Sequence, residues 1–451
     1  MIPEDHDAFS SLSNNLGLVL QAQGDLAGAR TMIERAVKID EASFGPDHPS
    51  VARDVSNLGT VLEASGDLAG RSIPQGNDVA LSLLYNRSML IYDLDFPSLE
   101  NLFKEWNEPT YRAKQVWQGL YQHLYNSPEQ FSNLPKSLRE KLAEHTTFTP
   151  FKVKVFQDSS DGFTRKTLFE LPDNNLIEAV LMRYGDPADN PQITASAPDS
   201  KNLRGAKNRR TLCISTQAGC AMGCVFCATG QMGFKRHLSS GEIVAQVMYY
   251  ARMLKDVNES VTNIVFMGMG EPFHNYDNTM SAIDRLNDAD GYNFGARRFT
   301  ISTVGLVPQI MRFADERRQV NLAISLHAAD DDERLQIMPV NKRYKIKDVI
   351  DACRYYVDLT GRRVTFEWAL INGVNDSPEV AKKLASRLKG LMCHVNAIPL
   401  NPTTGYSGKA TDHQRAIQFK ESLEQAGIPC TIRMRRGIDI QAGCGQLAGS
   451  V

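Results

Sequence analysis

The stretch CISTQAGCAMGCVFCATG, residues 213–230, contains four of the eight cysteines in the chain. Three of them, Cys220, Cys224 and Cys227, are spaced C-x-x-x-C-x-x-C, and Cys213 precedes this group by seven positions. The stretch overlaps the end of the apolar run TLCIST, which predicts a β-strand. We therefore expect the three thiols to lie on a loop at the carboxyl end of a strand.

The spacing of the three cysteines limits which metal they can bind. A structural zinc site needs four ligands and commonly pairs two C-x-x-C motifs, yet only Cys224 and Cys227 are spaced in that way. Zinc with His237 as a fourth ligand remains an alternative. A cubane iron–sulfur cluster has four irons, each with one outer ligand. Three thiolates leave one of these irons free to bind a substrate or cofactor, just as catalytic metal sites keep one position open.

Beyond Thr211 the chain alternates between apolar runs typical of strands and amphipathic helices. The runs are TLCIST, NIVFMG, RFTIST, VNLAISL, RVTFEWAL, HVNAIPL and CTIRM. One intervening helix has a capping-box pattern at its start, with Ser239 followed by Glu242. This alternation predicts a parallel sheet that curls into a whole or partial barrel, with active groups at the carboxyl ends of its strands.

The region before the barrel contains a repeat and further elements. LGLVLQAQGDLAGAR at 16–30 returns as LGTVLEASGDLAGR at 58–71, and each copy has the pattern of a helical hairpin that resembles a tetratricopeptide repeat. Two later runs, TLFEL and NLIEAVLMRY, predict strands. We assign residues 1–75 to a repeat fragment, 80–150 to a helical accessory domain whose basic side chains could touch nucleic acid, 151–210 to a connector with strands and a loop, and 211–451 to the barrel.

The composition excludes several classes of protein. The 451 residues suffice for two or three domains, and the net charge is −2 with 42% hydrophobic residues. No apolar run approaches the roughly 20 residues of a membrane span, and the start lacks a signal pattern, so we expect a cytoplasmic protein. In the cytoplasm, cysteines are expected to be ligands or reactive thiols. Three basic groups could meet phosphates or simply face solvent: 201–210, 297–298 and 433–436.

Motifs downstream of the cysteines carry a family resemblance. MGMGEPFHN at 267–275 is a glycine-rich strand end, and ISTVGLVP, AISLHA, FEWALINGVND and IPLNP follow it in order. Together with the three-cysteine loop, the series resembles the radical S-adenosylmethionine (SAM) superfamily and, within it, the RlmN/Cfr methyltransferases of RNA adenosine. The resemblance covers roughly residues 90–448 and has no counterpart for residues 1–75. It implies an α/β fold: a partial (βα)6-type radical SAM barrel with a small N-terminal helical domain, preceded here by a short α-hairpin repeat appendage.

The resemblance also implies cofactors and the residues that bind them. The cofactors are a [4Fe-4S] cluster on Cys220, Cys224 and Cys227 and two SAM molecules per turnover, one of which is cleaved to a 5′-deoxyadenosyl radical. Gly268 and Gly270 would permit close approach of the backbone. The residues that match the family's SAM contacts are Gly270, Glu271, Ser302, Ser325, Leu326, His327 and Asn401.

Two cysteines outside the cluster motif match the family's reactive cysteines. Cys444, in RRGIDIQAGCGQL, matches the cysteine that carries a methyl group, and thiolates are good nucleophiles for such a transfer. Cys213 matches the partner that attacks its sulfur, forms a disulfide and releases the product. Glu178, in NLIEAVLM, matches the candidate base. The alternatives are buried free thiols and a strand glutamate that faces solvent.

The resemblance finally implies substrates and partners. The expected substrates are adenosine in 23S rRNA at the peptidyl-transferase centre, methylated at carbon 2, and adenosine beside the tRNA anticodon. An electron donor such as flavodoxin is expected, the chain is expected to be a monomer, and no membrane is involved. The alternatives are methylation at carbon 8, a radical SAM reaction on a non-RNA substrate, and a repeat scaffold with an inactive barrel.

Overall fold

The computed structural model describes residues 4–22, 24–44, 51, 54, 55, 57, 58, 61, 88–184, 209–433 and 435–449. The chain divides into two compact units: Met1–Met89 with Glu140–Thr147, and Leu90–Arg139 with Phe148–Val451. Within the described part of the chain, no helix is both long and apolar enough to cross a membrane. All the residues of the candidate site belong to the second unit.

The first unit contains two long helices, α1 (Glu4–Ala22) and α2 (Leu26–Phe44). Gly17 lets the two helices approach closely, because a Cβ at this position would lie 2.4 Å from the buried Ile33 side chain. The break between the helices falls at the Gly-Asp pair, as predicted for the first copy of the repeat. The second copy, at 58–71, lies almost entirely outside the described residues.

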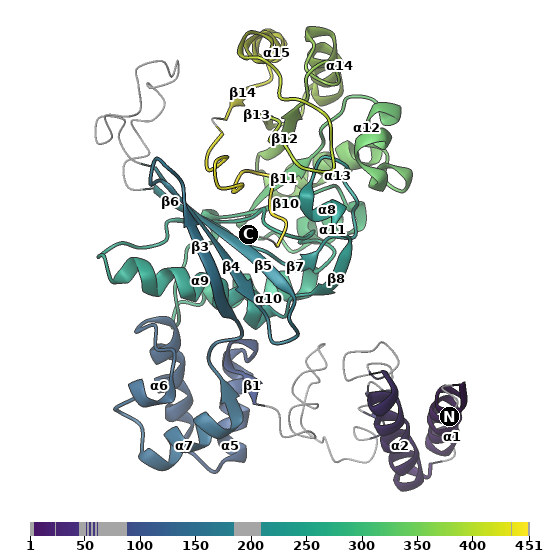
Figure 1. The fold of residues 1–451 in the computed structure, drawn as a ribbon, viewed down its shortest axis with the longest axis vertical. Coiled ribbons are helices and arrows are strands. Elements are labelled where there is room, and N and C mark those ends of the chain that lie inside the picture. The colour runs from purple at the N-terminus through teal and green to yellow at the C-terminus, as the bar shows by residue number, and fades with distance from the viewer. Residues whose placement is uncertain are drawn as a thin grey trace. The chain divides into compact units, whose positions relative to one another are not determined.

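A ten-stranded mixed sheet is the centre of the second unit, in the order β14-β13-β12-β11-β10-β9-β6-β5-β4-β3 (Figure 1). The seven strands from β14 to β6 are parallel to one another, and each of them matches one run that the sequence analysis identified. The order does not close on itself, so the barrel is partial, as predicted. The parallel strands are β6 (Arg209–Cys213), β9 (Asn263–Phe266), β10 (Phe299–Thr303), β11 (Asn321–Ser325), β12 (Val364–Leu370), β13 (Cys393–Pro399) and β14 (Cys430–Ile432).

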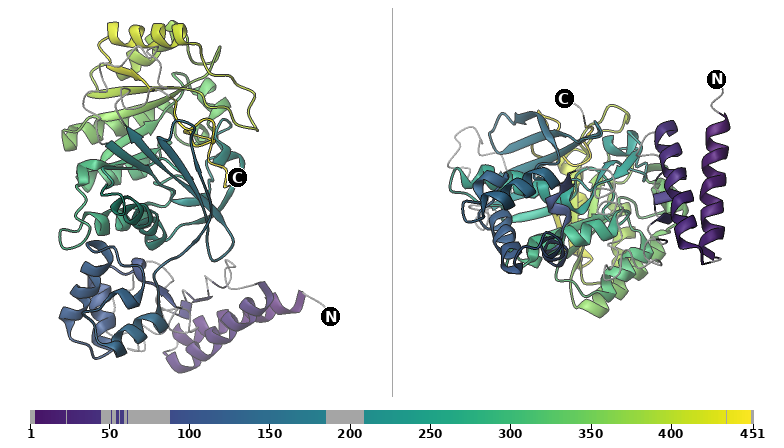
Figure 2. Two further views of the ribbon diagram at one scale, coloured as in Figure 1. Left: turned by 60° about the vertical axis from the view of Figure 1, so that its left-hand side comes forward. Right: turned by 90° about the horizontal axis from the view of Figure 1, so that it is seen from below.

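Helices connect consecutive parallel strands and lie on the outside of the curved sheet (Figure 2). The helix after the cysteine loop begins with the predicted capping box: the Ser239 hydroxyl accepts from the Glu242 amide, and the Glu242 carboxylate accepts from the Ser239 amide at 2.9 Å. The connecting helices are α9 (Ser240–Lys255), α10 (Tyr276–Asn287), α11 (Val307–Asp315), α12 (Asp331–Ile337), α13 (Ile346–Thr360), α14 (Pro378–Leu388) and α15 (His413–Gln425).

Three antiparallel strands extend the sheet beyond β6: β3 (Lys152–Asp158), β4 (Thr164–Glu170) and β5 (Leu176–Tyr184). The sequence predicts β4 and β5 but not β3. β3 is the edge strand, and most of its side chains are exposed, so KVKVFQD lacks the apolar run that marks a buried strand. Lysines on an exposed edge also discourage pairing with another sheet.

A small helical segment precedes these strands and is attached to the barrel. The Gln122 amide donates to the Asp290 carbonyl at 2.8 Å, and the Arg285 guanidinium donates to the Tyr92 and Asp93 carbonyls. Inside the segment, Gly119 leaves room for the Phe131 ring. The helices of this segment that lie wholly in the second unit are α5 (Phe96–Glu105) and α6 (Thr110–Tyr121), whereas β1 (Met89–Leu90) and α7 (Lys136–His145) cross the division between the units and β2 (Thr146–Thr147) belongs to the first unit.

Candidate active site

The three clustered cysteines lie on a loop after β6 that is fixed at several points. The loop leaves the hairpin strand β7 (Gln217–Gly219), passes through α8 (Ala228–Gln231) and returns in β8 (Phe234–His237). The Cys220 amide donates to the Gly233 carbonyl at 2.9 Å, and the Val225 amide donates to the Ile337 carbonyl at 3.1 Å. The backbone therefore holds the loop in place at the carboxyl end of the sheet.

The three thiols have raised pKa values, so they ionise only when a positively charged group is bound beside them. Burial raises the pKa of Cys220 to about 12 and raises the pKa values of Cys224 and Cys227. Cys224 feels the charge of both other thiols, so its ionisation is opposed further. Buried thiolates need a compensating positive charge, and a coordinated metal supplies it by displacing the protons.

A single bound ion does not fit these thiols. Among the described residues, no group of three or more His, Cys, Asp or Glu side chains is arranged to hold one metal ion. His237, the alternative zinc ligand, forms a hydrogen bond instead. Its Nδ1 lies 3.0 Å from the side-chain amide nitrogen of Gln217, and His237 does not line the cavity of the cysteines. In a cubane cluster each thiolate binds a different iron, which suits three thiols that face one cavity.

That cavity has a volume of about 140 Å³ and lies at the carboxyl ends of the parallel strands. It brings together all of the predicted SAM contacts except Leu326, whose side chain is buried in the core. Cys444, from the C-terminal segment, also lines this cavity. The predicted residues in its wall are Cys220, Cys224, Cys227, Gly270, Glu271, Ser302, Ser325, His327 and Asn401.

The glycine-rich strand end is shaped by close backbone contacts. A Cβ on Gly268 would lie 2.6 Å from the Ile214 carbonyl, and a Cβ on Gly270, which has φ +99°, would lie 2.5 Å from Gln217. The glycines therefore permit the close approach of this strand end to the chain that follows β6. The Glu271 carboxylate stabilises the backbone around this strand end, because it accepts hydrogen bonds from the Phe273 and Val304 amides.

His327 and Asn401 present polar atoms to the cavity. The Ala369 amide donates to Nδ1 of His327 at 2.9 Å, and burial lowers the pKa of this histidine to about 3, so Nε2 carries the proton of a neutral ring. Asn401 donates to the Cys444 carbonyl at 3.0 Å, while its buried Oδ1 has no hydrogen-bond partner among the residues that the structure describes. An unpaired buried acceptor is costly and suits the amino group of a bound SAM.

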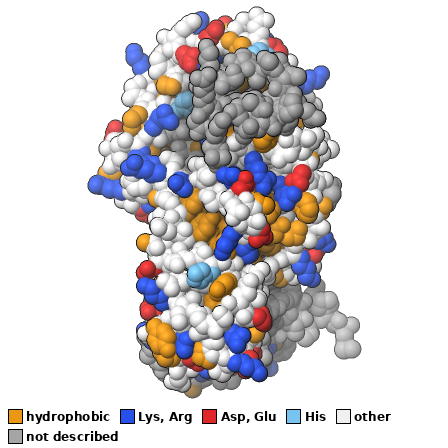
Figure 3. All heavy atoms as spheres, turned by 90° about the vertical axis from the view of Figure 1, so that its left-hand side faces the viewer, with side chains coloured by type: hydrophobic (Ala, Val, Ile, Leu, Met, Phe, Trp, Pro, Cys, Tyr) orange, Lys and Arg blue, Asp and Glu red, His pale blue; other side chains and the backbone are white. Residues whose placement is uncertain are grey.

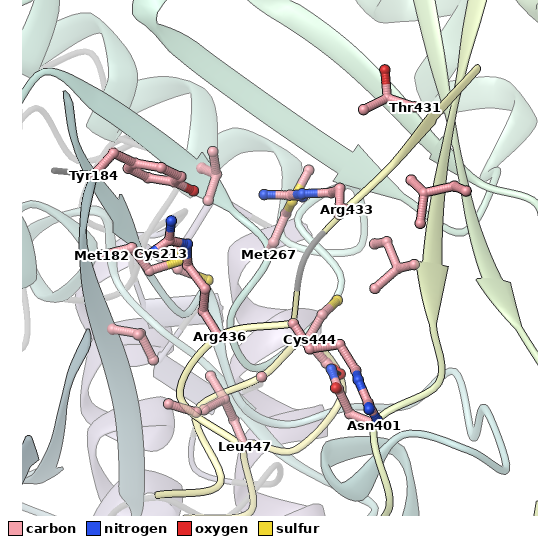
Figure 4. Close-up of a pocket in the computed structure, with 17 residues that line it drawn as sticks. Met182, Tyr184, Cys213, Met267, Asn401, Thr431, Arg433, Arg436, Cys444 and Leu447 are labelled. Atoms are coloured by element: carbon pink, nitrogen blue, oxygen red, sulfur yellow. Dashed lines mark hydrogen bonds between the residues drawn. The ribbon is translucent and has the colours of Figure 1, made fainter. Parts of the chain in front are cut away.

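A second cavity, of about 240 Å³, adjoins the first (Figure 4). Val180, Met182 and Tyr184 of β5 form one wall, and Cys213 at the end of β6 faces it. Asn401, Cys444 and three apolar residues line both cavities. Cys444 therefore stands between the space beside the cluster cysteines and the space beside Cys213.

Both reactive cysteines of the prediction line this second cavity (Figure 4). Burial raises the pKa of Cys213 to about 12, and the nearby Cys444 contributes to the shift. Cys444 is exposed as a residue, but the protein packed around its sulfur desolvates the thiol; this desolvation and the Glu367 carboxylate raise the pKa of Cys444 to about 11, while Arg433 opposes this shift. Both thiols are free in this structure.

The sequence analysis missed Glu367, one of two charged residues beside Cys444, and considered the other, Arg433, only as part of a basic group that could meet phosphates. Glu367 is 6% exposed, lines the cofactor cavity and accepts from the Asn396 amide, and Arg433 lines the second cavity. The signal was present, because Glu367 interrupts the otherwise apolar strand FEWAL. An ionisable residue inside such a run needs a partner.

Glu178, the predicted base, lies on β5 but lines neither cavity. Its carboxylate is fully buried, 3.0 Å from the Lys166 ammonium, and it accepts from the Ala448 and Gly449 amides. Burial raises its pKa despite the lysine. The structure therefore places Glu178 under the C-terminal segment that carries Cys444.

An open parallel barrel with three cysteines after its first strand defines the radical SAM class, and the family model for the radical SAM superfamily matches residues 214–385. The ribosomal RNA large subunit methyltransferase N-terminal domain matches residues 89–148, and a tetratricopeptide repeat matches residues 7–69. Membership of this superfamily implies a [4Fe-4S] cluster and SAM, and the three thiols and the cavity with its unpaired acceptor fit both.

The chain belongs to the RlmN family. It is 46% identical over 361 residues to "Dual-specificity RNA methyltransferase RlmN 1" of Myxococcus xanthus, covering 80% of this chain and 94% of that protein. It is 46% identical over 370 residues to a probable dual-specificity RNA methyltransferase RlmN of Chloroflexus aurantiacus, covering 80% and 92%. A radical SAM methyltransferase structure from Sphaerobacter thermophilus matches with a TM-score of 0.74 and 47% identity, covering 80% of this chain and all of that one.

Proposed function

We propose that the chain methylates carbon 2 of adenosine in 23S rRNA, at the peptidyl-transferase centre, and in tRNA next to the anticodon. The names of the RlmN relatives support an RNA substrate. The observation that carries the proposal is the position of Cys444 in the wall shared by the two cavities. One thiol there can meet a cofactor on one side and a base on the other.

The cofactor cavity holds the groups that activate the methyl donor. Cys220, Cys224 and Cys227 would hold the cluster, and His327 and Asn401, which line the same cavity, would present polar atoms to SAM. When bound, the cluster and SAM supply the methyl group and the radical that activates it. Carbon 2 of adenine is not nucleophilic, so the methyl group must be activated on the protein before it meets the base.

Cys444 is the residue that carries the methyl group. Its thiol loses a proton, and Sγ then forms a bond to the methyl carbon as the donor sulfur leaves. Arg433, which lowers the pKa of Cys444 against the effect of burial, favours the thiolate. The S-methyl carbon would lose one hydrogen atom to the SAM-derived radical before it bonds to the base, and the adduct would give one electron back to the cluster. The Cys213 thiolate then attacks Sγ of Cys444, and the S–C bond breaks with its electron pair left on the carbon. That carbon takes up a proton as the base loses one from the methylated carbon, so a disulfide forms between the two cysteines and the modified base is released.

Glu178 is proposed as the group that removes the proton from the carbon being methylated. Its carboxylate contacts Lys166 and the amides of 448–449, so this role requires the C-terminal segment to move aside. The same contacts give Glu178 a second task, which is to anchor the segment that positions Cys444.

The substrate adenosine must leave its stack to reach the second cavity. We propose that the helical accessory domain at 80–150 and the basic groups hold the RNA backbone, apart from Arg210, which forms an ion pair with Glu259. On the face drawn in Figure 3, Lys and Arg side chains form several separate groups with acidic side chains among them. The distribution of charge on this face therefore does not mark a single path for the RNA backbone. An electron donor such as flavodoxin, a monomeric state and a cytoplasmic location complete the proposal.

Product analysis tests this function. Anaerobically reconstituted protein is incubated with methyl-labelled SAM and transcripts of the rRNA region and of tRNA, and the nucleosides are separated by mass spectrometry. We expect labelled 2-methyladenosine, and we expect Cys213→Ala to accumulate a protein–RNA crosslink. Labelled 8-methyladenosine would move the reaction to carbon 8. No label in either RNA would contradict the proposal and favour a non-RNA substrate.

A further inference from the structure

The second cavity has an arginine-rich end that the proposed chemistry does not use. Tyr184, the last residue of β5, lies there with two guanidinium groups over its ring. The Arg209 Cζ is 5.1 Å from the ring centroid and the Arg436 Cζ is 4.7 Å from it. Arg433 interacts with the same tyrosine side chain. Figure 4 shows Tyr184, Arg433 and Arg436 around this end of the cavity.

The register of two strands fixes how far this end lies from the reactive thiols. In the antiparallel pair of β5 and β6, Val180 is opposite Cys213 and Tyr184 is opposite Arg209. Side chains two residues apart share a face of a sheet, so Tyr184 and Arg209 stand on the cavity face with Cys213. The two pairs are four residue steps apart, which corresponds to about 14 Å along the strands at roughly 3.4 Å per residue.

Two of the guanidinium groups at this end have no carboxylate partner. Within the described residues no carboxylate forms an ion pair with Arg209 or Arg436, whereas Arg433 lies near the Glu367 carboxylate. The opposite face of the same two strands differs, because Arg183 and Arg210 both pair with Glu259. Alternation along the two strands thus places Arg183 and Arg210 beside the Glu259 carboxylate on one face. It places Arg209 on the other face, where it stacks on Tyr184.

We propose that Tyr184, Arg209 and Arg436 form a phosphate clamp that binds the RNA backbone next to the adenosine being methylated. Stacking on an aromatic ring uses the flat face of a guanidinium and leaves its N–H donors free at the edge. Those donors match the paired oxygens of a phosphate. The clamp rests on the proposed function. It adds that a backbone phosphate of the RNA is bound, and that it is bound at Tyr184.

The clamp determines how far the adenosine enters the second cavity. A phosphate held at Tyr184 directs the attached base along β5 toward Cys213 and Cys444, which both line the cavity. The contact is made with the backbone, so it carries no sequence information by itself. It acts equally on the rRNA and tRNA substrates.

Binding of RNA to the reconstituted holoenzyme tests the clamp. The probe is a fluorescein-labelled single-stranded RNA dodecamer with one adenosine, titrated by anisotropy at several salt concentrations. The variants are Arg209→Gln and Arg436→Gln, and the matched control is Arg210→Gln, one residue away on the opposite face. Each lost phosphate contact reduces the salt slope by about 0.7 for a single strand, which is about a fourfold weaker affinity at 0.15 M salt. Because both guanidinium groups hold one phosphate, the double variant is expected to lose that one contact and to bind about fourfold more weakly, and Arg210→Gln to bind as the wild type does.

Neutralising the phosphate shows whether the contact is direct. A methylphosphonate next to the adenosine is expected to weaken wild-type binding about fourfold and to have no further effect on the double variant. Equal salt slopes for the double variant and Arg210→Gln, or additive effects of variant and methylphosphonate, would overturn the clamp. If these results appear while the wild type still methylates RNA, the clamp alone fails. If the wild type methylates no RNA, the proposed function fails and the clamp with it.

Discussion

The contact between Glu178 and the C-terminal segment predicts how strongly this segment is held. Glu178→Ala removes the carboxylate that accepts from the Ala448 and Gly449 amides at 2.9 and 3.3 Å. Hydrogen bonds to a charged group contribute about 1.5–3 kcal/mol each, so losing both releases the segment by about 3 kcal/mol or more. Since 1.4 kcal/mol is about a factor of ten, we expect both amides to exchange with solvent at least about a hundredfold faster.

Hydrogen exchange read by mass spectrometry on the C-terminal peptide measures this effect. Lys166→Met is the matched variant, because it removes the partner ammonium at 3.0 Å and leaves the carboxylate that receives the amides. Breaking a buried pair is expected to lower overall stability by about 3–5 kcal/mol in either variant, but only Glu178→Ala loses both acceptors. Unchanged exchange of residues 448–449 in Glu178→Ala would refute the anchoring role. Accelerated exchange would show that lost activity in Glu178 variants includes displacement of Cys444.

Three further predictions follow from the geometry. Desolvation raises the pKa of Cys444 to about 11, so its thiolate fraction in the apoprotein grows about tenfold per pH unit from pH 7 to 10. The rate of alkylation of Cys444 by iodoacetamide, measured on its peptide, should rise in the same proportion. A plateau of this rate near pH 9 would contradict the raised pKa. Gly268→Ala places a Cβ 2.6 Å from the Ile214 carbonyl, so we expect about 1–3 kcal/mol of destabilisation and weaker SAM binding by calorimetry, whereas wild-type affinity would show that the strand end adapts. Removal of residues 1–75 should leave methylation of RNA unchanged, because the RlmN relatives match about 80% of the chain without it; loss of product from the shortened protein would assign the repeat fragment a part in catalysis.

The parts of the fold that could be predicted are those with a local signal. The seven parallel strands and the capping box of α9 each depend on a few consecutive residues, and all of them are present. β3 was missed because an exposed edge strand has no apolar run. The position of the cysteine loop after β6 followed from chain order alone.

The parts of the site that escaped prediction depend on contacts between distant residues. Glu178 meets Ala448, 270 positions away, and no pattern near either residue announces the contact. The stacking of Arg436 on Tyr184 likewise joins the end of β5 to the segment after β14. Glu367 was visible as a charge in an apolar strand, but its place beside Cys444 needed the fold. The predicted roles of individual site residues remain predictions.

The central claim is that Cys444, standing between two cavities, carries the methyl group to the RNA. The most direct measurement is peptide mass spectrometry of the anaerobic holoenzyme after incubation with deuteromethyl-labelled SAM, first without RNA and then with it. We predict a labelled methyl group on Cys444 before RNA is added, its loss when RNA is supplied, and no label in RNA with Cys444→Ala. Labelled RNA from the Cys444→Ala variant would contradict the claim.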